Sequence, residues 1–109
     1  MDRGMRPPNV LKLDGLALDI ETRELTVEHR THRLRPKECL LLRTFMSHPG
    51  ETLTREFLMQ EVWETDYFED TRTIEVHVSW LRQKIETDTS EPQHILTVRG
   101  IGYMFMVNN

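Results

Sequence analysis

The segment RTIEVHVSWLRQKI at residues 72–85 separates into two faces when it is projected at about 100° per residue. One face carries the apolar residues at positions i, i+4, i+7 and i+11, namely Ile74, Val78, Leu81 and Ile85. That spacing is typical of a helix that packs one side against a protein core. The segment therefore predicts an amphipathic helix with one buried stripe.

The opposite face is unusual because it carries no acidic residue in a chain whose net charge is −4. It holds Arg72, Thr73, Val76, Ser79, Trp80 and Gln83, with His77 and Lys84 at its edge. Arg and Thr side chains suit phosphates, whereas Val and Trp suit thymine methyl groups or sugars in a DNA major groove. The alternative is that Trp80 belongs to the core or covers a loop, and that Val76 is an isolated apolar residue on the surface. The helix alone leaves both interpretations open.

Upstream of this helix, apolar and polar residues alternate with a period of two, which is typical of short strands. Tight turns separate the apolar stretches. The pattern predicts four antiparallel strands, at residues 11–13, 16–20, 25–27 and 32–35. Residues 1–9 (MDRGMRPPN) are interpreted as a linker or a cloning remnant, so that the domain spans residues 10–109.

Two further helices are predicted between the strands and residues 72–85. Pro36 suits the first position of a helix because its missing N–H would be unpaired there, and an apolar stripe follows at Cys39, Leu42 and Met46. Pro49-Gly50 ends this helix. Thr54 can cap the second helix, which runs to Trp63. Residues 64–70 (ETDYFED) then form an acidic, aromatic loop.

The C-terminal segment has the pattern of a hairpin. Residues 95–98 and 103–107 are predicted strands, and Gly100 in the intervening turn suits a positive φ. Strands and helices are segregated along the chain, so the predicted fold class is α+β.

Length and composition limit the function classes. The chain has 109 residues, 38% hydrophobic and 29% charged, which is ordinary for one globular domain. The negative charge is local: residues 36–69 hold three basic against seven acidic residues, and the rest of the chain balances at 11 against 11. A nucleic-acid surface would therefore have to be a patch. No apolar run is long enough to cross a membrane, and we expect a reducing, cytoplasmic location from the single Cys39.

Nothing in the sequence predicts catalysis, a metal site or a cofactor. The histidines are dispersed at residues 29, 32, 48, 77 and 94 with no cysteine partner. Cys39 lies on an apolar helical face, which indicates an inert buried thiol. The carboxylates of residues 61–70 lack a partner base, so an acidic, solvated loop is the better interpretation. Tyr67-Phe68 within that loop is interpreted either as a protein docking site or as an anchor of the loop onto the helices.

The runs LRPKECLLLRTFMSHPGETLTREFLMQEVW, DTRTIEVHVSWLRQKIE and ILTVRGIGYMF resemble, in order and spacing, the effector domain of OmpR/PhoB-type response regulators. The resemblance covers roughly residues 11–107. It implies a winged helix-turn-helix with an N-terminal four-stranded sheet, three helices and a C-terminal hairpin wing. It also implies sequence-specific binding of double-stranded DNA as the effector domain of a bacterial two-component system.

By position, the resemblance assigns contacts to individual residues. It implies phosphate contacts by Arg72, Thr73, His77, Arg82 and Tyr103, with Arg55 and Trp63 as further backbone contacts. It implies that Val76 and Trp80 face bases and that Thr97 and Arg99 lie in the wing beside the minor groove. It also implies a loop that touches RNA polymerase, with Glu64, Asp66, Tyr67, Phe68 and Glu69 as its contact residues.

Two positions depart from the family pattern. The family commonly has two arginines where this chain has Ser79 and Trp80, and the second of them is a typical base reader. We expect Ser79 to stay within the DNA-binding face, while recognition shifts toward apolar contact and DNA shape. Cys39 stands where the family usually has a bulky aromatic residue.

The resemblance also implies partners. These are promoter DNA with direct-repeat half-sites, a second protomer bound head to tail on that DNA, RNA polymerase, and a receiver domain elsewhere in a longer protein. The isolated domain is expected to be a monomer that does not bind membranes. The competing hypothesis is a winged-helix protein-interaction module without DNA binding, which the net charge of −4 favours.

Overall fold

The computed structural model describes residues 9–65 and 72–107, which form three helices and seven strands. The helices are α1 (Pro36–Ser47), α2 (Arg55–Trp63) and α3 (Arg72–Ile85). The strands are β1 (Val10–Leu13), β2 (Leu16–Asp19), β3 (Glu24–Val27), β4 (Arg30–Arg33), β5 (Thr52–Thr54), β6 (Ile95–Val98) and β7 (Gly102–Phe105). The linker proposed for residues 1–9 lies outside the described residues, except for Asn9, whose carbonyl accepts a hydrogen bond from the Ile20 N–H at 2.9 Å.

The first four strands form an antiparallel sheet in the order β1-β2-β3-β4, as the alternating pattern predicts. The position of β4 was predicted wrongly: it covers residues 30–33, not 32–35. A two-residue turn places Val27 opposite Arg30, with Glu28 at φ 57°. Neither turn residue is a glycine or asparagine, and the RTHR sequence of β4 has no apolar alternation that would set its register.

The C-terminal hairpin is present, but β5 adds a third strand that the sequence analysis did not predict, giving the order β5-β7-β6. This pairing brings the backbone of β5 very close to Gly102, because a Cβ there would lie 1.9 Å from the Leu53 carbonyl oxygen. Only a glycine fits this position in β7. Three residues are too few to show a strand period, which explains why the sequence pattern did not predict β5.

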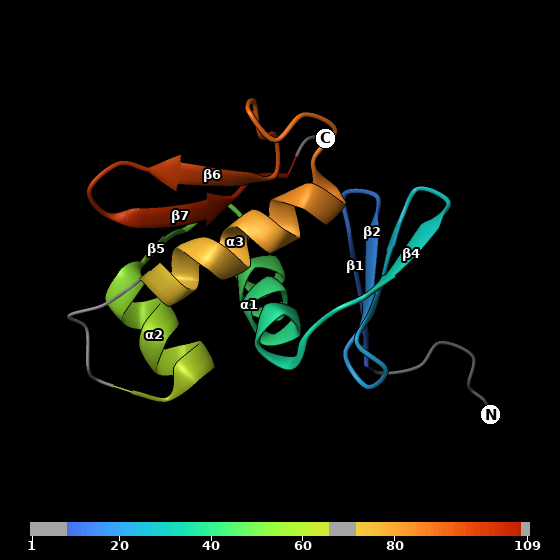
Figure 1. The fold of residues 1–109 in the computed structure, drawn as a ribbon, viewed down its shortest axis with the longest axis horizontal. Coiled ribbons are helices and arrows are strands. Elements are labelled where there is room, and N and C mark those ends of the chain that lie inside the picture. Colours follow the sequence, from blue (N-terminus) through green and yellow to red (C-terminus); the bar gives the residue numbers. More distant parts are fainter. Residues whose placement is uncertain (1–8, 66–71, 108–109) are drawn as a thin grey trace.

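The core lies between the helices and the two sheets. Phe45 of α1 is fully buried and packs against the rings of Tyr103 and Phe105 of β7, each with ring centroids 6.4 Å away. Leu58 of α2 and Ile74 of α3 are also fully buried. Figure 1 shows α3 crossing the molecule, with α2 on one side and the hairpin on the other, and the four-stranded sheet at the far end. The turn of the hairpin lies at the same end of the molecule as the start of α3.

Candidate nucleic-acid interface

The two faces of α3 lie as the 72–85 pattern predicts. The residues of the apolar stripe, Ile74, Val78, Leu81 and Ile85, are at most 5% exposed. Arg72, Thr73 and Ser79 are exposed, and Val76 is 45% exposed. Val76 lies in the middle of the helix, outside the buried apolar stripe, and is not part of the hydrophobic core. It leaves an apolar contact available to a partner.

Trp80 is half-buried, and its surroundings show why. The imidazole of His77 lies 4.8 Å from its ring and is itself 5.0 Å from the ring of Trp63. On another side, the Arg35 guanidinium lies 3.8 Å from the centre of the Trp80 ring. Trp80 therefore belongs neither to the core nor to the freely solvated surface. It joins a cluster of aromatic rings capped by a cation.

A hydrogen bond to the backbone determines which ring nitrogen of His77 carries a proton. Its Nδ1 lies 2.8 Å from the carbonyl oxygen of Thr73. Because a carbonyl can only accept, Nδ1 carries the proton of this hydrogen bond. In a neutral ring Nε2 is then an acceptor. His77 can donate to a phosphate through Nε2 only when the ring is doubly protonated.

The hairpin turn is exposed and has the expected backbone. Gly100 has φ 77°, and the Ile101 N–H donates to the Val98 carbonyl at 2.9 Å. Thr97 and Arg99 are exposed, and Ile101 is 49% exposed. The backbone N–H of Arg55 donates to the Ile101 carbonyl at 3.3 Å, which connects the turn to the start of α2. Arg55, at the start of α2, is half-buried.

Two of the predicted phosphate ligands are engaged inside the protein. Arg82 donates from Nε and Nη2 to the Ile95 carbonyl at 3.1 and 2.8 Å, and from Nη2 to the Thr97 hydroxyl at 2.9 Å. Tyr103 is only 4% exposed. Burial raises the pKa of Tyr103 above its ordinary value, against the opposing charges of Arg55 and Arg82. Its phenol remains a protonated donor, and Arg82 fastens β6 to α3.

A buried carboxylate holds the segment between α3 and β6. Glu86 is 8% exposed and accepts hydrogen bonds from the backbone N–H groups of Gln93, His94 and Ile95, the shortest at 2.7 Å. These bonds fix where β6 begins relative to the end of α3. The role of Glu86 is not predictable from the sequence, because an acidic residue after a helix and before a polar loop has no distinctive pattern.

Lys84, which was placed at the edge of the outward face, pairs with Glu38 of α1 at 2.5 Å. The Glu38 side chain is fully buried and also accepts from the Arg35 backbone N–H at 2.8 Å. In the same helix, Lys37 donates to the Val62 carbonyl at the end of α2 at 3.0 Å. These lysines tie the three helices together and contribute little to a cationic surface.

Most of the loop assigned to RNA polymerase, including Asp66, Tyr67, Phe68 and Glu69, lies outside the described residues. Glu64 is described: it is exposed, adopts a left-handed conformation with φ 53°, and donates from its N–H to the Gln60 carbonyl at 3.0 Å. It ends α2, as a left-handed C-cap commonly does.

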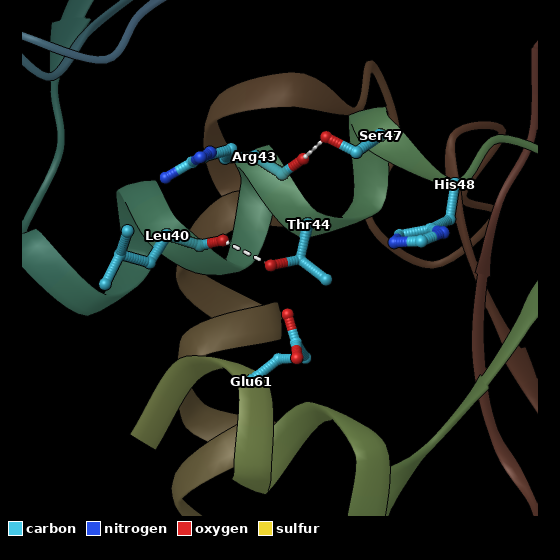
Figure 2. A pocket seen from close by; sticks show the side chains of 6 residues that line it. All are labelled: Leu40, Arg43, Thr44, Ser47, His48 and Glu61. Carbon is cyan, nitrogen blue, oxygen red and sulfur yellow. Dashed lines mark hydrogen bonds between the residues drawn. The ribbon is translucent and has the colours of Figure 1, made fainter. Parts of the chain in front are cut away.

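A polar pocket of about 240 Å³ lies between α1 and α2, lined by Leu40, Arg43, Thr44, Ser47, His48 and Glu61 (Figure 2). Its two hydroxyls donate to carbonyls one helical turn earlier, from Thr44 to Leu40 and from Ser47 to Arg43, both at 2.8 Å. Within residues 9–65 and 72–107 no cluster of three or more potential metal ligands occurs. The helices in these ranges also include none long and apolar enough to span a membrane.

Comparison with known proteins agrees with this geometry. Residues 29–105 match the family model described as the C-terminal domain of transcriptional regulatory proteins. The chain is 44% identical over 96 residues to the alkaline phosphatase synthesis transcriptional regulatory protein SphR of Synechococcus elongatus. The aligned region covers 88% of this chain and 37% of SphR.

Solved structures of similar domains share the fold. The DNA-binding domain of CpxR from E. coli superposes with a TM-score of 0.78 at 29% identity, covering 92% of this chain and 98% of that one. The Klebsiella pneumoniae RstA DNA-binding domain, solved in complex with the RstA box, superposes with a TM-score of 0.79 at 26% identity, covering 89% and 96%.

The chain spans 37 to 41% of the length of SphR and the next curated relatives that it matches. The family match at residues 29–105 runs from β4 to β7 and includes all three helices. This chain therefore belongs to the family of winged-helix, DNA-binding effector domains of OmpR/PhoB-type transcriptional response regulators.

Proposed function

We propose that α3 of this domain enters the major groove of promoter DNA while the β6–β7 turn reaches the neighbouring minor groove. The observation that carries this proposal is the 45% exposure of Val76 at the centre of α3. It lies on the same side of the helix as the exposed Arg72 and Thr73. A helix face that offers an apolar contact between phosphate-binding side chains suits a groove with base edges below and phosphates on its rims.

The contacts divide by their chemistry. Val76 and Trp80 face bases, with Ser79 beside them. Phosphates are bound by Arg72, Thr73 and His77, with Arg55 and Trp63 as further backbone contacts. In the wing, Thr97 and Arg99 approach the minor groove.

Arg82 and Tyr103 take part mainly through the position of the wing. The Nε and Nη2 groups of Arg82 are already bonded to β6, so only its remaining N–H groups can reach a phosphate. Tyr103 keeps its phenolic proton and so remains able to donate, but its burial limits what can reach it. Both residues help to hold the hairpin against α3.

The partners of the longer protein belong to the same proposal. Two copies bind direct-repeat half-sites head to tail, residues 64–70 touch RNA polymerase, and a receiver domain elsewhere in the protein controls assembly. We propose a cytoplasmic location, a monomeric state for the isolated domain, and no enzymatic activity. The RstA domain solved with its DNA box supports the DNA-binding part.

One observation favours a second candidate function, a winged-helix module that binds proteins. Arg82 and Lys84, two cations of α3, are engaged inside the domain, and the net charge of the chain is −4. Fewer cations remain for DNA than the sequence suggests. The two candidates differ in how their binding responds to salt, because phosphate contacts release counterions.

The test selects bound duplexes from a random library with the 109-residue chain and then titrates salt on the selected duplex. A DNA-binding domain should enrich one motif and lose affinity with a log–log slope of about −0.9 per phosphate contacted. Failure to bind any duplex, or binding that does not respond to salt, would contradict DNA binding and favour the protein-interaction module.

A further inference from the structure

Arg35 occupies a position that the stability of α1 does not explain. It is the N-cap residue of α1, where Ser, Thr, Asp or Asn is preferred because its side chain accepts from a helical N–H. A guanidinium has no acceptor, and a positive charge at the N-terminus of a helix is unfavourable. Arg35 makes no side-chain capping bond. Its guanidinium forms an ion pair with Glu38 in the first turn of α1 and also makes a second contact outside this helix.

That contact is with the proposed DNA-binding face. The Arg35 guanidinium lies 3.8 Å from the centre of the Trp80 ring, well inside the range of about 6 Å for a cation–π contact. Trp80 follows Val76 by one helical turn of α3, so the two share a side of the helix. Arg35, which precedes α1 in the chain, thus adds a cation to the C-terminal half of the outward face of α3.

Arg35 also remains accessible, with 55% of its side chain exposed. Its Nη1 forms an ion pair with Glu38 at 3.7 Å, which is longer than a hydrogen bond, and Glu38 is also paired with Lys84. Stacking on an aromatic ring occupies one flat side of a guanidinium and leaves its in-plane N–H groups available. These N–H groups form a planar fork that matches two oxygens of a phosphate.

We propose that Arg35 binds a DNA phosphate and that Trp80 holds its guanidinium in place. The proposal rests on the proposed major-groove docking of α3. Arg82 and Lys84 are engaged in contacts within the protein. Arg35 compensates for them, because it places another cation in the same C-terminal half of α3, beside Trp80. The site joins two elements that are 45 residues apart in the sequence, Arg35 before α1 and Trp80 in α3.

The test compares Arg35→Gln with Arg43→Gln, using the selected duplex at several salt concentrations. Arg43 is an exposed arginine of α1 that lines the pocket between α1 and α2, so its substitution removes the same charge elsewhere. Arg35→Gln should lower affinity by about tenfold near 0.1 M salt and reduce the steepness of the salt slope by about 0.9. Arg43→Gln should leave the slope unchanged.

Trp80→Ala should reduce affinity more than Arg35→Gln, because it removes the proposed base contact as well as the support of Arg35. The loss in the double variant should be smaller than the sum of the two single losses, because both substitutions disrupt the Arg35–Trp80 contact. Trp80→Phe, which keeps a ring below the guanidinium, should retain part of the affinity and covers the case in which the alanine variant does not fold. Melting curves confirm that each variant is folded.

Equal losses in Arg35→Gln and Arg43→Gln would overturn the proposal while leaving DNA binding intact, since the unaltered chain still binds. An altered base preference in Arg35→Gln, with an unchanged salt slope, would also overturn it by showing base contact. A chain that binds no duplex at all would overturn both the proposed function and this inference.

Discussion

Both halves of α3 carry polar side chains on the outward face, but in the structure these side chains make different contacts. In the first half, Thr73 and Val76 lie exposed on the outward side. In the second half, Arg82 is bonded to β6, Lys84 is paired with Glu38, and Trp80 is covered by Arg35. Helical periodicity separates the buried stripe from the outward face. It does not show which polar side chains of that face are used by the rest of the protein.

The largest expected effect is on stability, when the buried Glu38 that pairs with Lys84 in the second half of α3 is replaced. Glu38→Ala should destabilise the domain by about 3 kcal/mol, because it breaks a buried ion pair and removes the acceptor of the Arg35 N–H. Chemical denaturation measures the free energy of unfolding. The matched control is Glu56→Ala on the exposed surface of α2, which should change it by less than about 0.5 kcal/mol. An equal effect of the two substitutions would show that the pair with Lys84 contributes no stability.

Arg82→Ala tests whether the second half serves the wing. It should destabilise the domain by about 2 kcal/mol, because charge-assisted hydrogen bonds to the Ile95 carbonyl are lost. The same denaturation experiment measures this. If stability were unchanged and only DNA affinity fell, Arg82 would be a phosphate ligand, as is proposed for Arg72, and the contrast between the two halves would be wrong.

Arg99→Ala is the counterpart in the exposed wing. It should leave stability unchanged and weaken binding by about 1 kcal/mol, about equally for all duplex sequences, because a backbone contact carries no base information. Binding titrations against the selected duplex and a scrambled one measure this. A loss confined to the selected sequence would instead place Arg99 on a base edge.

Val76→Ala should have the smallest effect on affinity and the most selective one. Removing its methyl groups should cost less than about 1 kcal/mol at the preferred base pair and change the ranking of bases at that position. Repeating the library selection with the variant measures the ranking. If overall affinity fell with the ranking intact, Val76 would not face the bases.

Much of the candidate site was predictable because it depends on local features. The stripe from Ile74 to Ile85, the Thr54 cap and the positive φ of Gly100 each follow from spacing or residue type. The cap is confirmed by the hydrogen bond from the Phe57 N–H to the Thr54 hydroxyl at 3.0 Å. The family resemblance was confirmed by the comparisons, whereas the DNA contacts of individual residues stay predictions.

The site could not be predicted where one side chain meets a distant segment. The register of β4 depends on a turn without glycine, and β5 exists because Leu53 pairs with Tyr103, 50 residues later in the sequence. Glu86 could not be recognised as the residue that holds the start of β6, because its partners are backbone N–H groups, which every residue except proline has.

The sequence by itself determined the α+β class, the order of the three helices and of every strand except β5, and the two faces of α3, because hydrophobic burial acts on local periodicity. Only the tertiary structure decided which outward cations remain available to a partner. Ion pairs and hydrogen bonds form between groups that meet after folding, as when Glu38 takes up Lys84 and Trp80 receives Arg35. Distance in space decides such contacts, and distance along the chain carries little information about them.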